Sequence, residues 1–305
     1  MAAPTLTILV PTNDRPEVLR SVWPTWLQQE GLTQVVVVDD GSEVDYSGVF
    51  DELSRACAAR GVEFRAIRLV TRRGAPVARN AGLPHCKGED VLTTDDDILL
   101  GPDMVSRCRE ARRELPPQSV CGPRVVYLRD DETEAAAEAR SRADRRSYFD
   151  PATLTLVPWV TGSRPLQVPF VTAVALWPRS LFDRGLRYFE GYGGNGYREE
   201  TDPQLRAQAE YGATVHFVPT ATVYHLPPRL AYARKSGQRR MGLLAFEWHV
   251  LANNARFLRR HGALLRARFE IRALSAWFAL LRTRISPLRA VALVRNRRAA
   301  RRAKA

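Results

Sequence analysis

Short apolar runs alternate with segments of helical periodicity over the first third of the chain. Residues 6–10 and 35–38 are runs of β-branched and other apolar residues, and polar turn residues follow each run. Between them, Val18, Val22 and Trp26 fall at helical spacing, which predicts a strand, a helix and a second strand. The alternation continues with a helix at 48–60, a strand at 64–70, a helix at 76–84 and a strand at 90–93. This order is typical of a mostly parallel sheet flanked by helices.

The pattern becomes less regular after this alternation. Residues 129–147 are dense in alanine and in charges of both signs, which favours a solvated helix or a flexible excursion over a core element. Residues 168–177 predict a buried strand. The remaining expected elements are a glycine-rich loop at 191–196, a helix at 203–211, and two short strands at 214–218 and 222–226 around Pro219.

The last part of the chain shows two amphipathic helical patterns. Leu244, Trp248 and Leu251 begin the first pattern, which runs over residues 243–258, and a second one runs over residues 271–285. We therefore expect an α/β domain at residues 1–228 and a helical C-terminal extension at residues 229–305.

Charge separates these two parts. The chain has a net charge of +13, but residues 229–305 hold 20 Lys and Arg against 2 Asp and Glu, and residues 1–228 carry a small negative charge. The basic extension can pack back on the domain or lie on an anionic membrane surface. A high net charge also suggests nucleic-acid binding, but that class leaves the acidic motifs below unexplained. We therefore expect no specific nucleic-acid partner.

Several classes of protein lack their usual patterns here. The chain contains neither GxGxxG nor GxxxxGK[ST], which argues against dinucleotide and P-loop binding. No secretory signal precedes residue 6, and no apolar run reaches the roughly 20 residues of a membrane span. No CxxC pair indicates a zinc site or a disulfide framework among Cys57, Cys86, Cys108 and Cys121. We expect a cytoplasmic protein.

Polar and acidic residues gather where the predicted strands end. Residues 12–15 and 39–42 follow the first two strands, and Asp95 to Asp97 follow a later one. Ligands bind at the carboxyl ends of strands in sheets of this kind. The first two groups suit hydrogen bonds to a nucleobase and ribose, although Asp-Asp-Gly-Ser is also an ordinary turn. Asp95 and Asp97 can bracket Mg²⁺ or Mn²⁺, because hard cations take carboxylate oxygens and share the remaining positions with diphosphate and water.

An acidic cluster follows the glycine-rich loop. The loop can lie close to a substrate, and Glu199 or Glu200 can supply a general base. We assign Asp202 to capping the helix that begins there. His225 follows a predicted strand, where a lone histidine is more often a packed core residue than a metal ligand.

Six motifs, taken in order, give the chain a resemblance to a known family. They are VPTNDRPEVL (10–19), VVVVDDGS (35–42), GAPVARNAGL (74–83), VLTTDDDI (91–98), GYREETDPQLR (196–206) and PTATVYHL (219–226). Together they resemble the GT-A glycosyltransferases of family 2 over about residues 5–228. The resemblance implies a Rossmann-like GT-A domain at residues 1–228 that binds a nucleotide sugar and transfers its sugar.

In that family the first two motifs hold the nucleotide. The resemblance therefore places the stretch that starts at Pro11 against the donor. It implies that Thr12, Arg15 and Asp39 contact the base and ribose and that Asp40 supports them.

The next two motifs imply a diphosphate and metal site. Arg79 would lie near the diphosphate or support the metal-binding carboxylates. The DxD motif of the family maps onto Asp95 and Asp97. It implies that Asp97 ligates Mn²⁺ or Mg²⁺ directly, while Asp95, which also belongs to the metal motif, or Asp96 reaches the donor ribose or sugar.

The last two motifs imply the base and a further metal ligand. The Glu-Asp pair of the family falls on Glu199 and Glu200, which makes Glu200 the catalytic base. His225 matches a histidine that completes the metal site in some relatives.

Three departures from the family pattern bear on these implications. Asn13-Asp14 stands where many relatives have an aromatic residue or histidine followed by Asn, which affects base stacking. Glu200 replaces the usual Asp and adds one methylene to the reach of the base. Residues 238–242, QRRMG, only partly echo the QxxRW signature of processive synthases.

The resemblance thus implies an inverting, non-processive and metal-dependent transferase. It favours a UDP- or dTDP-sugar as donor and a glycan, lipid-linked or small-molecule acceptor. The basic extension adds peripheral attachment to the inner face of a membrane as an expectation. The alternative is a basic nucleic-acid- or membrane-binding protein with a catalytically inactive GT-A domain.

Overall fold

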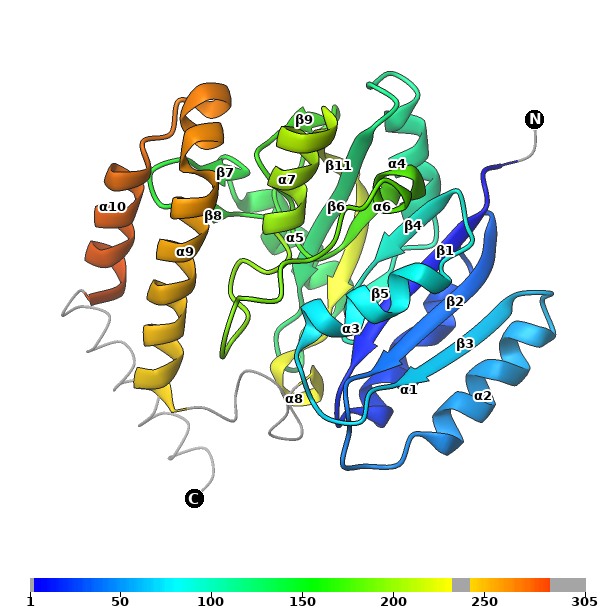
Figure 1. Ribbon diagram of the computed structural model, residues 1–305. Helices are drawn as coiled ribbons and strands as arrows, with labels where there is room; N and C mark the ends of the chain where they lie inside the picture. The colour runs from blue at the N-terminus through cyan, green and yellow to red at the C-terminus, as the bar shows by residue number, and fades with distance from the viewer. Residues whose placement is uncertain (1–2, 232–241, 286–305) are drawn as a thin grey trace.

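A computed structural model of the chain describes residues 3–231 and 242–285 (Figure 1). Over these residues one curled, mostly parallel sheet forms the centre, with helices on both of its faces. Its strand order is β3-β2-β1-β4-β10-β6-β11-β5, and β9 pairs with β11 at the side of this path. The strands are β1 (Leu6–Thr12), β2 (Leu32–Asp39), β3 (Glu63–Arg68), β4 (Asp90–Thr93), β5 (Ile98–Leu100), β6 (Ser119–Tyr127), β9 (Leu166–Gln167), β10 (Ala175–Pro178) and β11 (Thr214–His225).

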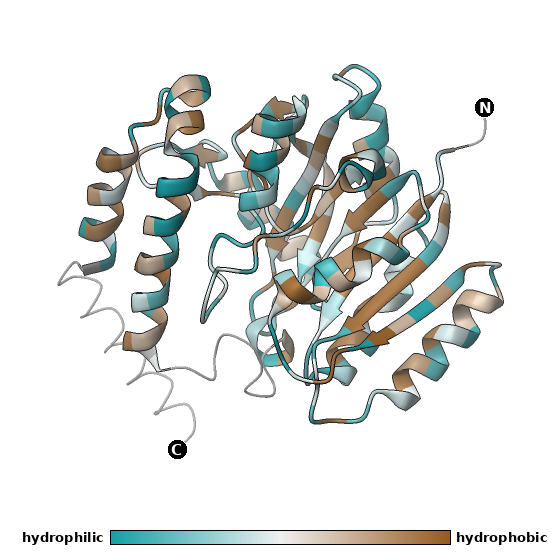
Figure 2. Ribbon diagram, in the orientation of Figure 1, coloured by the Kyte–Doolittle hydropathy of each residue, from teal (hydrophilic) through white to brown (hydrophobic). Residues whose placement is uncertain are grey.

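The first half of the sheet confirms the predicted alternation. Strands β1, β2, β3 and β4 are parallel neighbours, with Ile8 opposite Val35 and Leu92. All seven residues of β1 are buried, as expected for a strand covered on both faces. Hydrophobic colour runs through these central strands in Figure 2. The connecting helices are α1 (Pro16–Trp26), α2 (Ser47–Ala58) and α3 (Ala75–Gly82), and α3 continues into a short 3-10 helix at Leu83–His85.

The stretch predicted as one strand over 168–177 is strand only in β10, so that prediction was wrong in length. The backbone before β10 finds other partners. The side-chain Oε1 of Gln204 accepts from the N–H of Val171 at 2.6 Å, and its Nε2 donates to the carbonyl of Val171 at 3.0 Å. The backbone N–H and C=O groups of a buried segment can therefore be hydrogen-bonded without pairing with a neighbouring strand.

The two short strands predicted around Pro219 are one strand, β11, which corrects that prediction. The register against β6 shifts between Val218 and Thr222. Proline cannot donate to a ladder, so the strand passes it with an irregularity instead of ending. Strands β5 and β6 and helix α4 (Met104–Arg112) were not predicted.

The remaining elements are helices and short strands outside the predicted alternation. Of the two alternatives for residues 129–147, the structure contains a helix, α5 (Glu134–Ala143), and Thr133 caps it by accepting from the N–H of Ala136. The others are the hairpin strands β7 (Phe149–Asp150) and β8 (Thr155–Leu156) and the helices α6 (Arg179–Asp183), α7 (Asp202–Tyr211) and α8 (Pro228–Ala231).

The two helices predicted in the extension are present as α9 (Leu243–Phe269) and α10 (Ala273–Ile285), which lie side by side (Figure 1). Helix α9 packs back on the first part of the chain, because Phe257 and Leu258 share a buried cluster with Phe170 and Leu205. Among the helices described here, none combines the length and apolar character needed to cross a membrane.

Candidate active site

A cavity of about 940 Å³ opens at the carboxyl ends of β1 and β4. The segments predicted to carry chemistry meet there: the first strand end, Asp40, the acidic triplet, the glycine-rich loop and His225. Of the predicted site residues, those that line it are Pro11, Thr12, Arg15, Asp40, Asp95, Asp96, Asp97, Glu199 and His225. Asp39, Arg79 and Glu200 do not line it, although Arg79 contacts two residues that do.

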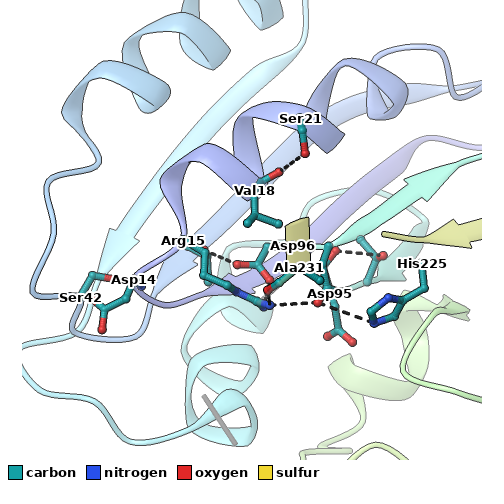
Figure 3. Close-up of polar contacts among 12 residues, drawn as sticks. Asp14, Arg15, Val18, Ser21, Ser42, Asp95, Asp96, His225 and Ala231 are labelled. Atoms are coloured by element: carbon teal, nitrogen blue, oxygen red, sulfur yellow. Dashed lines mark hydrogen bonds and ion pairs between the residues drawn. The ribbon is translucent and has the colours of Figure 1, made fainter. Parts of the chain in front are cut away.

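Arg15 contacts the acidic triplet (Figure 3). Its Nη1 donates to Oδ2 of Asp97 at 2.9 Å and to the carbonyl of Ala231 at 3.2 Å, and its Nη2 pairs with Asp96. This guanidinium contacts the carboxylates, and the contact with base and ribose that the resemblance implied stays a prediction. One positive charge thus offsets part of the repulsion within the triplet.

Asp96 is the most enclosed acid of the triplet. It is fully buried, and its Oδ2 accepts from the hydroxyl of Thr12 at 2.6 Å. Burial raises the pKa of Asp96 to about 6, with Arg15 acting against that rise and Asp97 adding to it. Thr12 is held in turn by the hydroxyl of Tyr46 at 2.8 Å. Thr12 and Asp96 therefore form the inner wall of the site.

Asp39 and Asp40 take different roles. Asp39 is fully buried; its Oδ1 accepts from the N–H of Ser42 at 2.9 Å, and its Oδ2 lies 3.5 Å from Nε of Arg68. Asp40 faces the cavity and accepts from the N–H groups of Arg73 and Gly74, each at 2.7 Å. Burial raises the pKa of Asp40, while these two backbone hydrogen bonds oppose it.

Gly41 allows this arrangement. Its φ of 65° lies in the left-handed region, and an added Cβ would come within 2.5 Å of the backbone at Thr71 and Arg72. Only glycine avoids both costs. The loop after β2 can therefore lie directly against the loop before α3, where Arg72 and Arg73 also line the cavity.

Arg79 joins two acidic motifs. Its side chain is buried, its Nη2 donates to Oδ1 of Asp95 at 2.6 Å, and its Nη1 donates to Oε1 of Glu199 at 3.1 Å. Burial raises the pKa of Glu199 to about 8, and the charge of Arg79 opposes that rise. The guanidinium thus connects the DxD motif to the cluster at 196–202.

Glu200 differs from its neighbour. It is partly exposed, and within the described parts of the chain its carboxylate makes no hydrogen bond to another side chain. Burial of the carboxyl raises its pKa, while hydrogen bonding to its own backbone N–H and the charges of Arg198 and Arg79 oppose the rise. One carboxylate oxygen of Glu199 is therefore held by Arg79, whereas no other side chain in the described parts of the chain holds the carboxylate of Glu200.

His225 lies beside Asp97. Its Nε2 is 3.7 Å from Oδ2 of Asp97, its Nδ1 contacts the carbonyl of Leu226 at 2.8 Å, and its ring stacks on Tyr127 at 5.0 Å. No group of three His, Cys, Asp or Glu side chains suitable for a metal occurs within residues 3–231 and 242–285. A carboxylate and an imidazole directed at the same space fit a divalent cation that takes its other ligands from diphosphate and water.

Asp202 does not cap α7, so that prediction was wrong. Thr201 occupies the N-cap position without a side-chain capping bond, and Asp202 is the first residue of the helix. The fully buried Asp202 accepts instead from Tyr192 Oη at 2.8 Å, from Arg260 Nε at 2.8 Å and from His261 Nε2 at 2.7 Å. Its carboxylate faces α9, and no local pattern around residue 202 indicates that partner.

Sequence reasoning also missed part of the cavity wall. The glycine-rich loop was expected near substrate and does line the cavity, through Gly193, Gly194 and Asn195. Phe246 of α9 lines it as well. Asn253 of α9 donates to the carbonyl of Gly193 at 2.9 Å, so this helix holds the loop. The amphipathic pattern of α9 predicted a helix but gave no signal for these contacts.

The chain resembles several known proteins. Residues 7–162 match the family described as glycosyl transferase family 2. Over 106 residues the chain is 33% identical to an undecaprenyl-phosphate 4-deoxy-4-formamido-L-arabinose transferase of Pseudomonas syringae pv. syringae (strain B728a), a match covering 33% of this chain and 31% of that one. Over 101 residues it is 31% identical to an N-acetylglucosaminyltransferase of Rhizobium leguminosarum bv. trifolii, covering 33% and 54%. The first of these matches spans about a third of the relative's length.

Solved structures share the fold at low sequence identity. S. aureus TarS 1-349 in complex with UDP-GlcNAc has a TM-score of 0.54 and 14% identity, over 83% of this chain and 66% of that one. Mannosyltransferase PcManGT from Pyrobaculum calidifontis, in complex with GDP-Man and Mn²⁺, has a TM-score of 0.52 and 17% identity, over 94% and 89%. The fold is thus that of GT-A glycosyltransferases, and the chain belongs to glycosyl transferase family 2.

Proposed function

We propose that this protein transfers a single sugar from a nucleotide-sugar donor to an acceptor hydroxyl, with inversion at the anomeric carbon and with a divalent cation. One observation carries the proposal. The cavity at the strand ends brings together the acidic triplet, His225 and Glu199, and Arg79, outside the lining, pairs with Asp95 and Glu199. These charged groups suit a leaving diphosphate, and Glu200, the proposed base for the attacking hydroxyl, directly follows Glu199 in the chain.

The donor nucleotide lies along the first strand end in this proposal. Pro11, Thr12 and Asp40 line that part of the cavity, and Arg72 and Arg73 add positive charge beside them. A UDP- or dTDP-sugar is the proposed donor. TarS, which shares the fold, is described in complex with UDP-GlcNAc, while PcManGT is described with GDP-Man.

The proposed metal site consists of Asp97 and His225, with Asp95 next to them. Mn²⁺ or Mg²⁺ held there offsets negative charge on the leaving nucleoside diphosphate. Arg79 contributes a fixed positive charge from behind Asp95. PcManGT and GalNAc-T7, both similar in fold, are described with Mn²⁺.

Glu200 is the proposed base. A base must have an accessible lone pair close to the proton that it takes. Glu200 is partly exposed and is the residue that the family resemblance implies, whereas Oε1 of Glu199 already accepts from Arg79. In this proposal Glu200 takes the proton from the acceptor hydroxyl as the hydroxyl oxygen attacks the anomeric carbon. Glu199 keeps Arg79 in place.

The acceptor approaches from the side formed by the glycine-rich loop and α9. A lipid-linked acceptor has support from the undecaprenyl-phosphate transferase that this chain resembles. The first turns of α9 expose Leu244 and Trp248, in a region rich in arginine. We therefore include an anionic membrane surface, on the cytoplasmic side, as the place where the acceptor is met.

A donor screen tests the proposal. Nucleotide sugars are tested with Mn²⁺ for thermal stabilisation, because a ligand that binds only the folded state raises stability. The stabilising donor is then incubated with candidate acceptors, and NMR of the product gives the anomeric configuration. Transfer with inversion supports the proposal. Absence of both stabilisation and transfer for every nucleotide sugar, together with binding to vesicles or nucleic acid, would support the inactive-domain alternative.

A further inference from the structure

We infer that Arg198, held by Asn254 of α9, is a positioning residue for the acidic pair Glu199 and Glu200. The inference rests on the proposed transfer function and extends it to a contact between two distant parts of the chain. Arg198 lies inside the motif at 196–206, but the role implied for that motif belongs to the two acids after it.

The backbone at Arg198 is in a conformation that side chains with a Cβ rarely adopt. Its φ is 79°, in the left-handed region. Gly194 and Gly196, just before it, also have positive φ values, but they lack a Cβ and pay no steric cost. A residue other than glycine keeps such a conformation only where its surroundings hold it there, and such residues concentrate at functional sites.

The surroundings of the Arg198 side chain supply that restraint. The side chain is buried, its Nε donates to Oδ1 of Asn254 at 2.9 Å, and its Nη2 donates to the carbonyl of Leu154 at 2.8 Å. Its guanidinium carbon lies 5.0 to 5.2 Å from the ring centres of Phe170, Tyr197 and Phe257. Hydrogen bonds and aromatic faces therefore fix the cation from several directions.

Asn254 is itself fixed. It is fully buried on α9, and its Nδ2 donates to the carbonyl of Val250 at 2.7 Å. This contact fixes the orientation of the amide, so that Oδ1 faces Arg198. The restraint on Arg198 thus comes from a rigid helix, through a residue 56 positions further along the chain.

The restraint passes directly to the acids. The N–H of Glu199 donates to the carbonyl of Gly196 at 2.8 Å, and the carbonyl of Arg198 accepts from the N–H of Asp202 at 3.1 Å. Arg198 extends to α9, while the next side chain, Glu199, extends to Arg79 of α3. The side chains of these two consecutive residues are therefore held by different helices, α9 and α3. The turn at Arg198 thus determines where Glu199 and Glu200 lie relative to Asp95.

The test compares three variants of the full-length protein. Asn254→Ala removes the acceptor of Arg198 Nε but leaves the aromatic contacts. We expect kcat for transfer to fall by about tenfold or more, since small misplacements of catalytic groups have effects of that size. The Kd for UDP with Mn²⁺ should stay within about twofold of the wild-type value, because the nucleotide end of the cavity is unchanged. A fall of kcat at an unchanged Kd is the pattern that misplaced catalytic groups produce. Amide exchange of residues 198–202 becomes faster. Asn254→Asp keeps an acceptor for Arg198 Nε but loses the donor to Val250, so it should recover part of kcat.

Gln29→Ala is the matched control. Gln29 is another buried amide, which joins the carbonyl of Gly101 and the N–H of Val105 away from the cavity. The Gln29→Ala variant should have a lower Tm and an unchanged kcat. Wild-type kcat and exchange in Asn254→Ala would overturn the inference, as would an equal fall of kcat in both alanine variants. If the wild-type protein transfers no sugar, the proposed function fails, and the exchange at residues 198–202 still decides whether Asn254 restrains this segment.

Discussion

The imidazole Nε2 of His261 lies 2.7 Å from Oδ2 of Asp202, although 59 positions separate the two residues. Arg260 and Tyr192 contact the same carboxylate, which is fully buried. This carboxylate joins the start of α7 to the middle of α9. The acidic cluster of the active site and the C-terminal helices are therefore parts of one packed unit.

Asp202→Asn should lower the free energy of unfolding by about 3 kcal/mol, because removing one member of a buried ion pair leaves the other charge without its partner. The pH dependence has a definite sign. Burial works against ionisation, but hydrogen bonds from His261 and Arg260 hold the pKa of Asp202 below its ordinary value of 3.8. The wild-type protein keeps this stabilisation above about pH 4 and loses it as the pH falls through the lowered pKa. Denaturant unfolding of both proteins at neutral and acidic pH measures the difference, which should shrink in acid.

Glu200→Gln should keep donor binding and lose most turnover. General-base catalysis of this kind typically contributes about 10²- to 10⁴-fold, and a glutamine side chain of nearly the same shape cannot take the proton. Steady-state kinetics with a titrated donor separates the two effects. Glu199→Gln is the comparison, and we expect it to weaken the contact with Arg79 while leaving more activity than Glu200→Gln. The reverse order would assign the base to Glu199.

The pH dependence of kcat should follow the ionisation of Glu200. Burial raises the pKa of this carboxyl above its ordinary value of 4.5. The base is active when ionised, so kcat should rise with pH and reach its plateau above that ordinary value. A plateau already reached at pH 4, or a fall of kcat over the same range, would contradict the assignment. Glu200→Gln should lack the acidic limb.

Asp97→Ala should abolish tight Mn²⁺ binding in the presence of UDP and reduce transfer. The variant removes the carboxylate that faces His225 and leaves the imidazole as the remaining protein ligand of the proposed pair. Electron paramagnetic resonance of free Mn²⁺ measures the binding directly. EDTA should stop transfer by the wild-type protein, and added Mn²⁺ or Mg²⁺ should restore it. Undiminished Mn²⁺ binding by the variant would place the metal elsewhere.

The exposed turns of α9 should help the protein bind anionic vesicles. Leu244 and Trp248 are 86% and 68% exposed, and residues 229–305 hold 20 Lys and Arg against 2 Asp and Glu. We expect co-sedimentation with phosphatidylglycerol vesicles, release at high salt, and weaker binding by the double variant Leu244→Ser, Trp248→Ser. Neutral vesicles serve as the control. Failure to bind anionic vesicles at low salt would remove the membrane surface from the proposal.

The sequence predicted those parts of the fold and site that depend on local pattern. The strands at 6–10 and 35–38 and the acidic triplet after β4 were placed correctly, because period, strand ends and turn residues are local properties. The division of the chain at residue 228 stays a prediction. Residues 238–241 of the partial motif at 238–242 lie outside the described residues, so single-sugar transfer remains part of the proposal.

What could not be predicted depends on contacts between distant segments. Asp202 has the sequence context of a helix cap, and only the packing of α9 shows that it binds Arg260 and His261. Likewise, the side chain of Gln204 takes the hydrogen bonds that a neighbouring strand would make with Val171. For this reason the first part of the apolar run predicted as strand, before β10, is not a strand. Side-chain partners more than thirty positions away leave no trace in periodicity.

Phe246 gives α9 a share in the wall of the cavity that also includes the strand ends proposed to hold the donor. In the proposed function, donor and acceptor recognition are thus carried by separate stretches of one chain. A relative that exchanged its last helices while keeping its strands would use the same activated sugar on a different recipient. Specificity for the recipient can then change in evolution without any loss of the chemistry at the metal.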